Sequence, residues 1–178
     1  MRRMLSIFTL FSAMMLVGSI LSPGVVRSAP PFGAPEDVAY AEQLWTALMK
    51  ARLVGAQAIN AMPYKGSVHK TILITLDGTV RLGDYSGAVI VKKMFQGPEV
   101  SVKAVANDPA TNLKIVAVMY KRKSGYDPVN RDWFYVKYNP DGSPQTNKKG
   151  DLMAGRVGKC IGCHESAPGG DFVYSYDR

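Results

Sequence analysis

The chain has 178 residues, of which 47% are hydrophobic, 20% charged and 10% aromatic. These values are typical of one globular domain, and they exclude a disordered chain, a collagen and a polytopic membrane protein. Lys and Arg number 22 against 14 Asp and Glu, so the formal net charge is +8.

Residues 1–29 have the pattern of a secretory signal peptide. Arg2 and Arg3 precede an apolar run from Met4 to Leu21, and a short segment with small residues follows the run. An uncleaved membrane anchor is the alternative, because a run of about 18 apolar residues is at the short limit of a bilayer span. Ser12 and Gly18 interrupt the run, so we favour cleavage and a periplasmic location.

A Pro-rich linker, residues 30–35, precedes the single expected domain, residues 36–178. We expect the linker to be extended and poorly ordered up to Pro35, which opens a helix. From Glu36 to about Val54, apolar residues recur at intervals of three and four. This spacing predicts an amphipathic helix, with Glu36 and Asp37 at its favourable amino end.

Five β-rich segments follow, and the connections between them are too short for crossover helices. We therefore expect an antiparallel sheet, which with the helix makes one α+β domain. Turns are expected at Asp77-Gly78 and at Asn139-Pro140-Asp141-Gly142. The predicted strands are Thr71–Leu76, Ala88–Lys92, Val100–Val105, Lys114–Lys121 and Trp133–Tyr138.

The two cysteines of the chain both fall in Cys160-Ile161-Gly162-Cys163-His164. This spacing is typical of covalent attachment of c-type haem: two thiols one helical turn apart bond the vinyl groups, and the adjacent imidazole becomes an axial ligand of the iron. We predict one haem c, held by Cys160 and Cys163 with His164 as the proximal ligand, on a C-terminal attachment segment of the α+β domain. Export supports this prediction, because c-type haem is attached outside the cytoplasm.

Other interpretations of the cysteines explain less. A thioredoxin-like pair needs an α/β context, which the residues after Cys163 do not provide. A zinc site would need the distant His69, and the adjacent Cys163 and His164 would have to share one tetrahedron. A four-residue disulfide loop gives His164 no role.

The sixth ligand of the iron is not evident from the sequence. His69 could be a distal ligand, but its place at the start of a strand favours a role at the solvent edge or in a turn. Two hypotheses stay open: an open distal site for a small molecule, and an electron carrier with a Met or His69 ligand. The methionines after the signal are Met49, Met62, Met94, Met119 and Met153, of which Met49 and Met119 have the spacing of core residues.

Four segments, Gly87–Lys93, Lys121–Gly142, Cys160–His164 and Asp171–Tyr176, together resemble the cytochrome P-460 family. The resemblance implies a mostly β monohaem protein, usually a homodimer, with a five-coordinate iron. Members are of two kinds. Cytochrome P-460 proper has a lysine cross-linked to the haem and oxidises hydroxylamine, whereas beta-type cytochromes c-prime lack that bond and bind nitric oxide or carbon monoxide in a hydrophobic distal pocket.

The resemblance places the family's lysine at Lys92, which we take as the candidate for a haem cross-link ahead of Lys93. Consecutive residues of a strand point to opposite faces, so one of the two lysines is expected to face inward. An inward lysine would be desolvated and biased toward its neutral, nucleophilic form. The alternative is that both mark a strand end, with their ammonium groups in water. In this family the strand Trp133–Tyr138 lies near the haem, so Trp133 or Phe134 is expected to wall the pocket.

We therefore expect an exported oxidoreductase that oxidises hydroxylamine or a related small nitrogen compound and passes electrons to a soluble acceptor. A non-catalytic protein that binds nitric oxide or carbon monoxide, and a simple electron carrier, are the alternatives. The distal acid or base is not identified, since Glu99, Asp108 and Glu165 are candidates by residue type only. The basic clusters Lys121–Lys123 and Lys148–Lys149 favour an acidic redox partner, and nucleic acid is not an expected partner.

Overall fold

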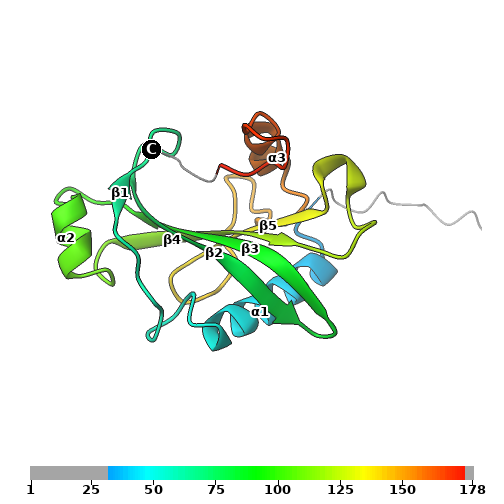
Figure 1. Cartoon of the computed structure of the whole chain (residues 1–178), viewed down its shortest axis with the longest axis horizontal. Coiled ribbons are helices and arrows are strands. Elements are labelled where there is room, and N and C mark those ends of the chain that lie inside the picture. The colour runs from blue at the N-terminus through cyan, green and yellow to red at the C-terminus, as the bar shows by residue number, and fades with distance from the viewer. Residues whose placement is uncertain (1–31, 175–178) are drawn as a thin grey trace, which may run out of the picture.

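The computed structural model of the chain describes residues 32–174. The predicted signal peptide, residues 1–29, and the first two positions of the linker lie outside this range. The elements in chain order are α1 (Pro35–Lys50), β1 (Tyr64–Lys65), β2 (Ile72–Leu82), β3 (Tyr85–Phe95), α2 (Val102–Asn107), β4 (Leu113–Lys121), a 3-10 turn (Pro128–Asn130), β5 (Trp133–Tyr138), β6 (Ala154–Gly155) and α3 (Gly158–His164). The strands form one antiparallel sheet in the order β1-β2-β3-β4-β5-β6, so the α+β prediction is confirmed (Figure 1).

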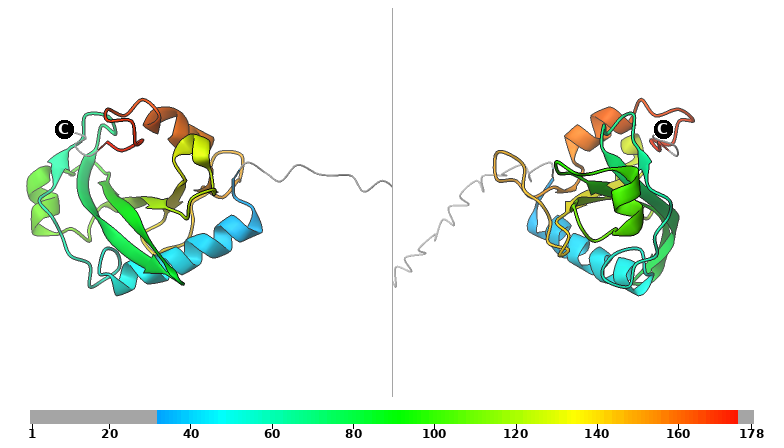
Figure 2. Two further views of the ribbon diagram at one scale, coloured as in Figure 1. Left: turned by 45° about the vertical axis from the view of Figure 1, so that its right-hand side comes forward. Right: turned by 90° about the vertical axis from the view of Figure 1, so that its left-hand side faces the viewer.

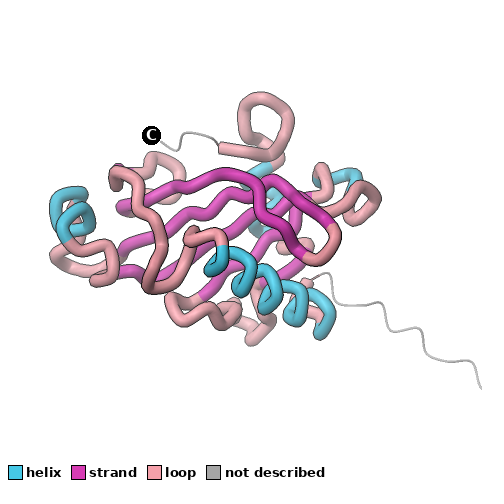
Figure 3. Tube along the Cα trace, turned by 60° about the horizontal axis from the view of Figure 1, so that its bottom comes forward, coloured by secondary structure: helices cyan, strands magenta, loops and turns pink. Residues whose placement is uncertain are grey.

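Helix α1 covers one face of the sheet, as Figures 1 and 3 show. Pro35 occupies its first turn together with Glu36 and Asp37, at the end where the helix dipole favours acidic residues. Its apolar stripe is buried at the spacing of one helix face and comprises Ala41, Leu44, Trp45 and Leu48. Burial of this stripe against the strands forms the main core.

Helix α1 ends at Lys50, earlier than the predicted end near Val54. Arg52 has a φ of 57°, which takes the backbone out of the right-handed helical region. Leu53 and Val54 are nevertheless buried, so the apolar pattern continues past the point where the helix stops. Among residues 32–174, none of the helices has the length and apolarity needed to span a bilayer.

Helix α3 lies on the opposite face of the sheet from α1 (Figure 2). Successive side chains of β5 point to opposite faces of the sheet. Phe134 and Val136 belong to the main core under α1, whereas Trp133 and Tyr135 belong to the cluster on the α3 side. A second apolar cluster fills the space beneath α3 and comprises Met119, Trp133, Tyr135, Met153 and Val157. The sheet therefore separates the main core from the helix that carries the cysteines.

The predicted turn at Asp77-Gly78 is wrong, because β2 continues through it. Gly78 pairs with Val89 of β3, and the two strands stay in register as far as Leu82 and Tyr85. The hairpin closes at Gly83, whose φ of 62° suits the two-residue turn between these strands. The Asp-Gly pair therefore lies inside a long hairpin, where the cross-strand pairing determines its conformation.

The predicted strand Val100–Val105 is also wrong, because Val102–Val105 belong to helix α2 and Ser101 caps that helix. The Ser101 hydroxyl accepts a hydrogen bond from the backbone N–H of Ala104 over 3.1 Å, as an N-cap residue does. Val105 is buried, whereas Val102 is exposed, so only one side of the segment contacts the core. A cap and a single buried position favour a short helix over a strand that would have no neighbour to pair with.

The end of the linker is held against the sheet, so the expectation of poor order is wrong for residues 32–34. Phe32 forms a β-bridge with Gly155, and the Gly33 N–H donates to the Ala154 carbonyl over 2.7 Å. Ala34 is buried immediately before α1 begins. This short extended segment therefore connects α1 to the edge of the sheet at β6.

The predicted turn at Asn139–Gly142 is present. The Gly142 N–H donates to the Asn139 carbonyl over 3.0 Å, and Gly142 has a φ of 94°. The Trp45 indole of α1 lies so close to Gly142 that a Cβ there would overlap it. The glycine is thus required both by the turn and by the close approach of α1.

Candidate functional site

Helix α3 brings the two cysteines onto neighbouring turns at the surface of the second apolar cluster. Both thiols are free; Cys160 is half-buried and Cys163 is exposed. Burial raises the pKa of the Cys160 thiol, and the nearby charges of Lys137 and Lys159 oppose that effect. The pair is therefore two separate thiols at the spacing of one helical turn, which suits bonding to two points on one flat ligand.

His164 is the last residue of α3, and its ring orientation is fixed by hydrogen bonding. Its Nδ1 lies 2.7 Å from the carbonyl oxygen of Phe172. Because a carbonyl only accepts, Nδ1 carries the proton, and Nε2 is the nitrogen that can coordinate a metal. Tyr135 and Tyr174 contact the imidazole edge-on, with ring centroids 5.5 and 5.6 Å away. The histidine is thereby held in one tautomer and one orientation.

The residue before Phe172, Asp171, is held to the sheet. The Trp133 indole N–H donates to the Asp171 carbonyl over 2.9 Å, and the Asp171 carboxylate pairs with Lys121 Nζ at 2.7 Å. Lys121 Nζ also lies 4.5 Å from the centre of the Trp133 ring. The next residue, Phe172, has a φ of 62°. We call Lys121, Trp133 and Asp171 the C-terminal latch, because together they fix the segment that orients His164.

A cavity of about 200 Å³ lies between α3 and the sheet. Cys160, Cys163 and His164 line one side of it. The sheet side is mainly apolar, with Ile90, Met94, Ala117, Val118 and Met119. A largely apolar cavity with a few convergent polar groups is the usual form of a small-molecule or cofactor site.

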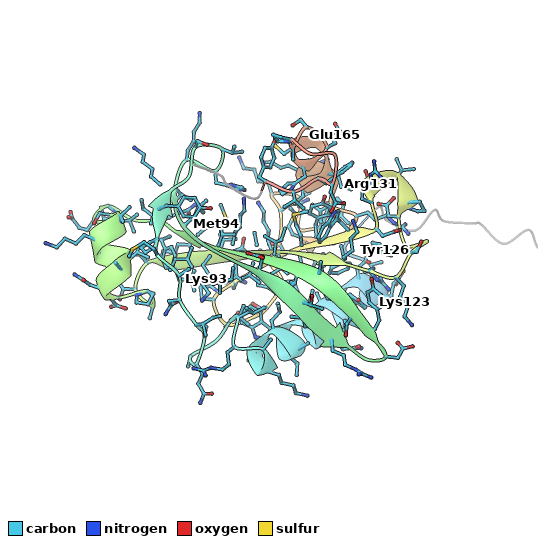
Figure 4. The ribbon with its side chains drawn as sticks, in the orientation of Figure 1. Lys93, Met94, Lys123, Tyr126, Arg131 and Glu165 are labelled. Atoms are coloured by element: carbon cyan, nitrogen blue, oxygen red, sulfur yellow. The ribbon has the colours of Figure 1, made fainter. Side chains whose placement is uncertain are left out.

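The structure brings Lys92 into this cavity and sends Lys93 to the other face of the sheet. Both side chains are buried, each only 5% exposed, so the alternative with two solvated ammonium groups is wrong. Lys92 lines the same cavity as the two cysteines and His164. Lys93 donates instead to the Ile59 carbonyl at 3.1 Å and to Asn60 Oδ1 at 3.3 Å. Lys93 and Met94 are labelled in Figure 4; Met94 lines the cysteine cavity.

Tyr135 is the aromatic residue of β5 that walls the cavity, in place of the expected Trp133 or Phe134. Strand alternation explains the difference, since Phe134 faces α1 and Trp133 packs deeper under α3. The Tyr135 hydroxyl is buried and has no hydrogen-bond partner among residues 32–174. Burial also raises its pKa, so it is a neutral donor. Leaving such a group unpaired costs about 1–3 kcal/mol, so the hydroxyl is suited to a polar atom of a group bound in the cavity.

Comparison with known proteins identifies the family. The family model described as Cytochrome P460 matches residues 78–175. The chain belongs to the cytochrome P460 family. The match covers most of the sheet and all of α3, including Lys92, Cys160, Cys163 and His164. No curated protein and no solved structure matches the chain.

Membership in the cytochrome P460 family implies a haem cofactor, and the residues around the cavity fit one. Two thiols stand one helical turn apart, the Nδ1–H tautomer of His164 presents Nε2 as a ligand atom, and the Tyr135 hydroxyl needs a partner. The sheet side of the cavity supplies the apolar surface that a porphyrin ring requires. These are thus the residue types that a c-type cytochrome uses to hold its haem.

His69 also lines the cavity, although its place in the sequence favoured a role at the solvent edge or in a turn. It lies on the loop between β1 and β2, which the Gly66 N–H closes by donating to the Thr71 carbonyl over 2.8 Å. Lys70, beside it, has a φ of 52°. His69 precedes the region that the cytochrome P460 family model matches. Its position in the fold depends on the pairing of β1 with β2, and no local pattern signals that.

The other candidates lie partly outside the cavity of this cytochrome P460 family member. Met94 and Met119 line it, whereas Met49 and Met62 are exposed and Met153 is buried in the cluster under α3. None of the three carboxylates proposed by type lines it: Glu99, Asp108 and Glu165. Figure 4 shows Glu165 at the outer side of α3. Asp108 accepts hydrogen bonds from Ala110 and Thr111 in its own loop.

Proposed function

We propose that the chain is an exported monohaem c-type cytochrome that oxidises hydroxylamine or a related small nitrogen compound. In this proposal the haem is attached through Cys160 and Cys163, with His164 as the proximal ligand and an open site on the other side of the iron. The observation that best supports it is that a single cavity, in a member of this family, is lined by both thiols, His164 and the buried Lys92. A bound haem supplies the redox-active iron.

Each protein group has a role in this proposal that follows from its contacts. The Phe172 carbonyl holds the His164 ring and raises the basicity of its Nε2. The Tyr135 hydroxyl donates a hydrogen bond into the cavity, and the apolar side chains of Ile90 and Met94 exclude water from it. Lys92 is the candidate for a third covalent tether to the haem.

His69 is the candidate for removing protons from a nitrogen substrate. Oxidation of hydroxylamine releases protons as well as electrons, so a base near the substrate assists it. No aspartate or glutamate of residues 32–174 lines the cavity, whereas His69 does. Imidazole is the commonest general base in enzymes, and we assign it that role here.

An acidic soluble acceptor is the proposed electron partner. Lys121 and Lys123 pair with Asp171 and Asp84 within the chain, and Arg122 stacks on aromatic rings, so this cluster is largely engaged internally. Lys137 and Lys159 instead line the cavity beside the cysteines. Unlike the buried Lys92, both have part of their surface exposed to solvent, so they place positive charge beside the proposed haem where a partner can meet it. A homodimer remains part of the proposal on the basis of family alone.

The position of His69 also favours a second candidate function, a simple electron carrier. Two histidines line one cavity, and a six-coordinate iron between His164 and His69 would have no open site for a substrate. A third candidate, capture of nitric oxide or carbon monoxide without turnover, agrees with the largely apolar sheet side of the cavity.

Intact mass and alkylation test the haem itself. Protein purified from a host competent in cytochrome maturation is expected to carry one haem, with neither thiol open to alkylation and the signal peptide removed. A colourless product whose Cys160 and Cys163 both react with iodoacetamide would end the proposal.

Optical spectra separate the three functions. If Lys92 is tethered, the Soret band of the reduced protein is strongly displaced to the red and the displacement is lost in Lys92→Met. Lys93→Met is the matched control, because the neighbouring lysine faces the other side of the sheet. Hydroxylamine turnover that is retained in Lys93→Met and reduced in His69→Ala supports the enzyme. A low-spin spectrum unmoved by carbon monoxide, which becomes responsive in His69→Ala, supports the electron carrier instead.

A further inference from the structure

Lys93 lines a second cavity, of about 290 Å³, that the proposed haem chemistry does not use. Lys92 lines the cysteine cavity and Lys93 the second one, so consecutive residues of β3 serve two cavities on opposite faces of the sheet. The walls of the second cavity come from α1, the loop that follows it, and the loop before β4. Its apolar lining includes Trp45, Val54, Ala58, Leu113 and Val116.

Within the part of the chain that the structure describes, no acidic side chain at this cavity balances the charge of the Lys93 ammonium. The side chain is 5% exposed, and its two hydrogen-bond acceptors, the Ile59 carbonyl and Asn60 Oδ1, are both neutral. Among residues 32–174, no aspartate or glutamate lines the cavity. An ammonium group has three N–H donors, so these two contacts leave one donor for a ligand.

Anchoring of the loop alone does not explain a lysine at this position. Lys93 stands in the sheet between Ile74 of β2 and Val116 of β4, both of them buried aliphatic residues. Burial disfavours the ammonium form and lowers the pKa of Lys93. A buried cation beside an apolar cavity is costly, and an anion in that cavity would offset the cost.

We propose that the second cavity binds a small aliphatic monocarboxylate. Its carboxylate would accept a hydrogen bond from Lys93 Nζ, and its hydrocarbon chain would lie against Trp45, Val54 and Val116. At roughly 30 Å³ for each water molecule, the cavity has room for a chain of several carbons. An inorganic anion would satisfy Lys93 but would leave the apolar walls without contact, so the lining favours the aliphatic acid.

Hexanoate is the probe, and its binding to the matured protein can be measured by saturation-transfer NMR. We expect a dissociation constant on the order of 1 mM, as suits a ligand of this size. Hexan-1-ol, which has the same chain but no charge, is expected to bind at least about tenfold more weakly. The absorption bands of the haem should not move on addition of hexanoate.

The decisive variant is Lys93→Met, which keeps the length and apolar character of the side chain. It should weaken hexanoate binding by at least about tenfold, whereas Lys103→Met on the exposed side of α2 should leave it unchanged. If Lys93→Met does not fold because residues 59–60 lose their anchor, Ala58→Leu decides, since it fills the cavity and keeps the lysine. Ala58→Leu should likewise weaken hexanoate binding by at least about tenfold.

Three results would overturn the proposal: no binding of hexanoate to the wild type, equal binding by the folded variant and the wild type, or a shift of the haem bands. The last would place hexanoate at the iron. Lys93 and Lys92 line separate cavities. Hexanoate binding can therefore be observed even if the proposed haem function is wrong, and the haem function can be confirmed even if hexanoate does not bind.

Discussion

The orientation of His164 depends on residues that do not touch it. The Phe172 carbonyl accepts from Nδ1, and the preceding residue is held by the Trp133 indole and by Lys121. A ligand histidine is tuned by the hydrogen bond on its second nitrogen. The C-terminal latch therefore connects β4 and β5 to the electronic properties of whatever His164 coordinates.

Replacing Trp133 with Phe should loosen this connection. The change removes the indole N–H that donates to Asp171 and some buried volume, so we expect the free energy of unfolding to fall by about 1–3 kcal/mol. The reduction potential of the bound haem should also shift, because the carbonyl facing His164 becomes less well fixed.

Trp45→Phe is the matched control for this variant. Trp45, the other tryptophan of the chain, lies on α1 and is buried in the main core, whereas Trp133 belongs to the cluster on the opposite face of the sheet. Trp45→Phe should reproduce the loss of stability seen by urea unfolding without the change in potential. Equal shifts of potential in the two variants would contradict a positioning role for Trp133.

At the scale of elements, the long β2–β3 hairpin contains two glycines, of which only one lies where there is no space for a side chain. A Cβ on Gly87 would overlap the Lys121 carbonyl oxygen and the Tyr120 ring, whereas a Cβ on Gly78 would meet nothing within 4 Å. The Tyr120 ring is buried, and its hydroxyl donates to the Val80 carbonyl over 3.1 Å. Close approach of β4 to β3 therefore requires glycine at one of these positions only.

We expect the alanine variants of the two glycines to change stability in opposite directions. Gly87→Ala should lower the free energy of unfolding by about 3 kcal/mol, because backbone and a buried ring must move. Gly78→Ala should raise it by about 0.5 kcal/mol, because glycine inside a strand is entropically unfavourable. Urea unfolding measures both, and a similar loss in the two variants would show that the Gly87 contact is not the cause.

Helix α2 gives a second test at this scale. Ser101→Ala removes the hydroxyl that accepts from the Ala104 N–H, so the free energy of unfolding should fall by about 1 kcal/mol. Amide exchange at Ala104 should accelerate. Ser86→Ala on β3 is the control and should change neither quantity appreciably; unchanged exchange at Ala104 in Ser101→Ala would argue against the cap.

Sequence patterns predicted those elements whose structure is set locally. The Cys160–His164 motif could be found because its geometry lies within one helical turn, and alternation predicts that Lys92 and Lys93 point to opposite faces. The pairing of Gly78 with Val89 overrides the Asp77-Gly78 turn signal, which is a long-range effect. The place of His69 at the cavity depends on the loop joining β1 to β2, and nothing in the neighbouring residues reports it.

At the scale of the whole molecule, the sheet is a partition with a different environment on each face. The face under α1 forms the larger core, and the face under α3 holds the cavity with Cys160, Cys163 and His164. Strands β3 to β5 contribute to both. A substitution that alters the register of the sheet would therefore disturb the stabilising core and the candidate site together.

Three aspartates in the loops around this sheet have lowered pKa values, and we expect the stability of the fold to depend on them in acid. Hydrogen bonds from Thr111 and Ala110 lower the pKa of Asp108, contacts with Lys123 lower that of Asp84, and hydrogen bonds from Ser143 lower that of Asp141. A carboxyl with a lowered pKa binds fewer protons folded than unfolded. Its contribution is complete above the ordinary value of 3.8 and is lost as the pH falls through the folded-state value.

Stability should therefore decline as the pH is lowered below about 4, where unfolded aspartates take up protons first. Asp37 acts in the opposite sense, because burial raises its pKa, but it is one group against three. Urea unfolding between about pH 5 and pH 2.5 should show a shallower decline in Asp108→Asn than in the wild type. Glu99→Gln, which leaves the three aspartates in place, should show the same decline as the wild type. If stability in Asp108→Asn declines as steeply as in the wild type, Asp108 does not contribute to the effect.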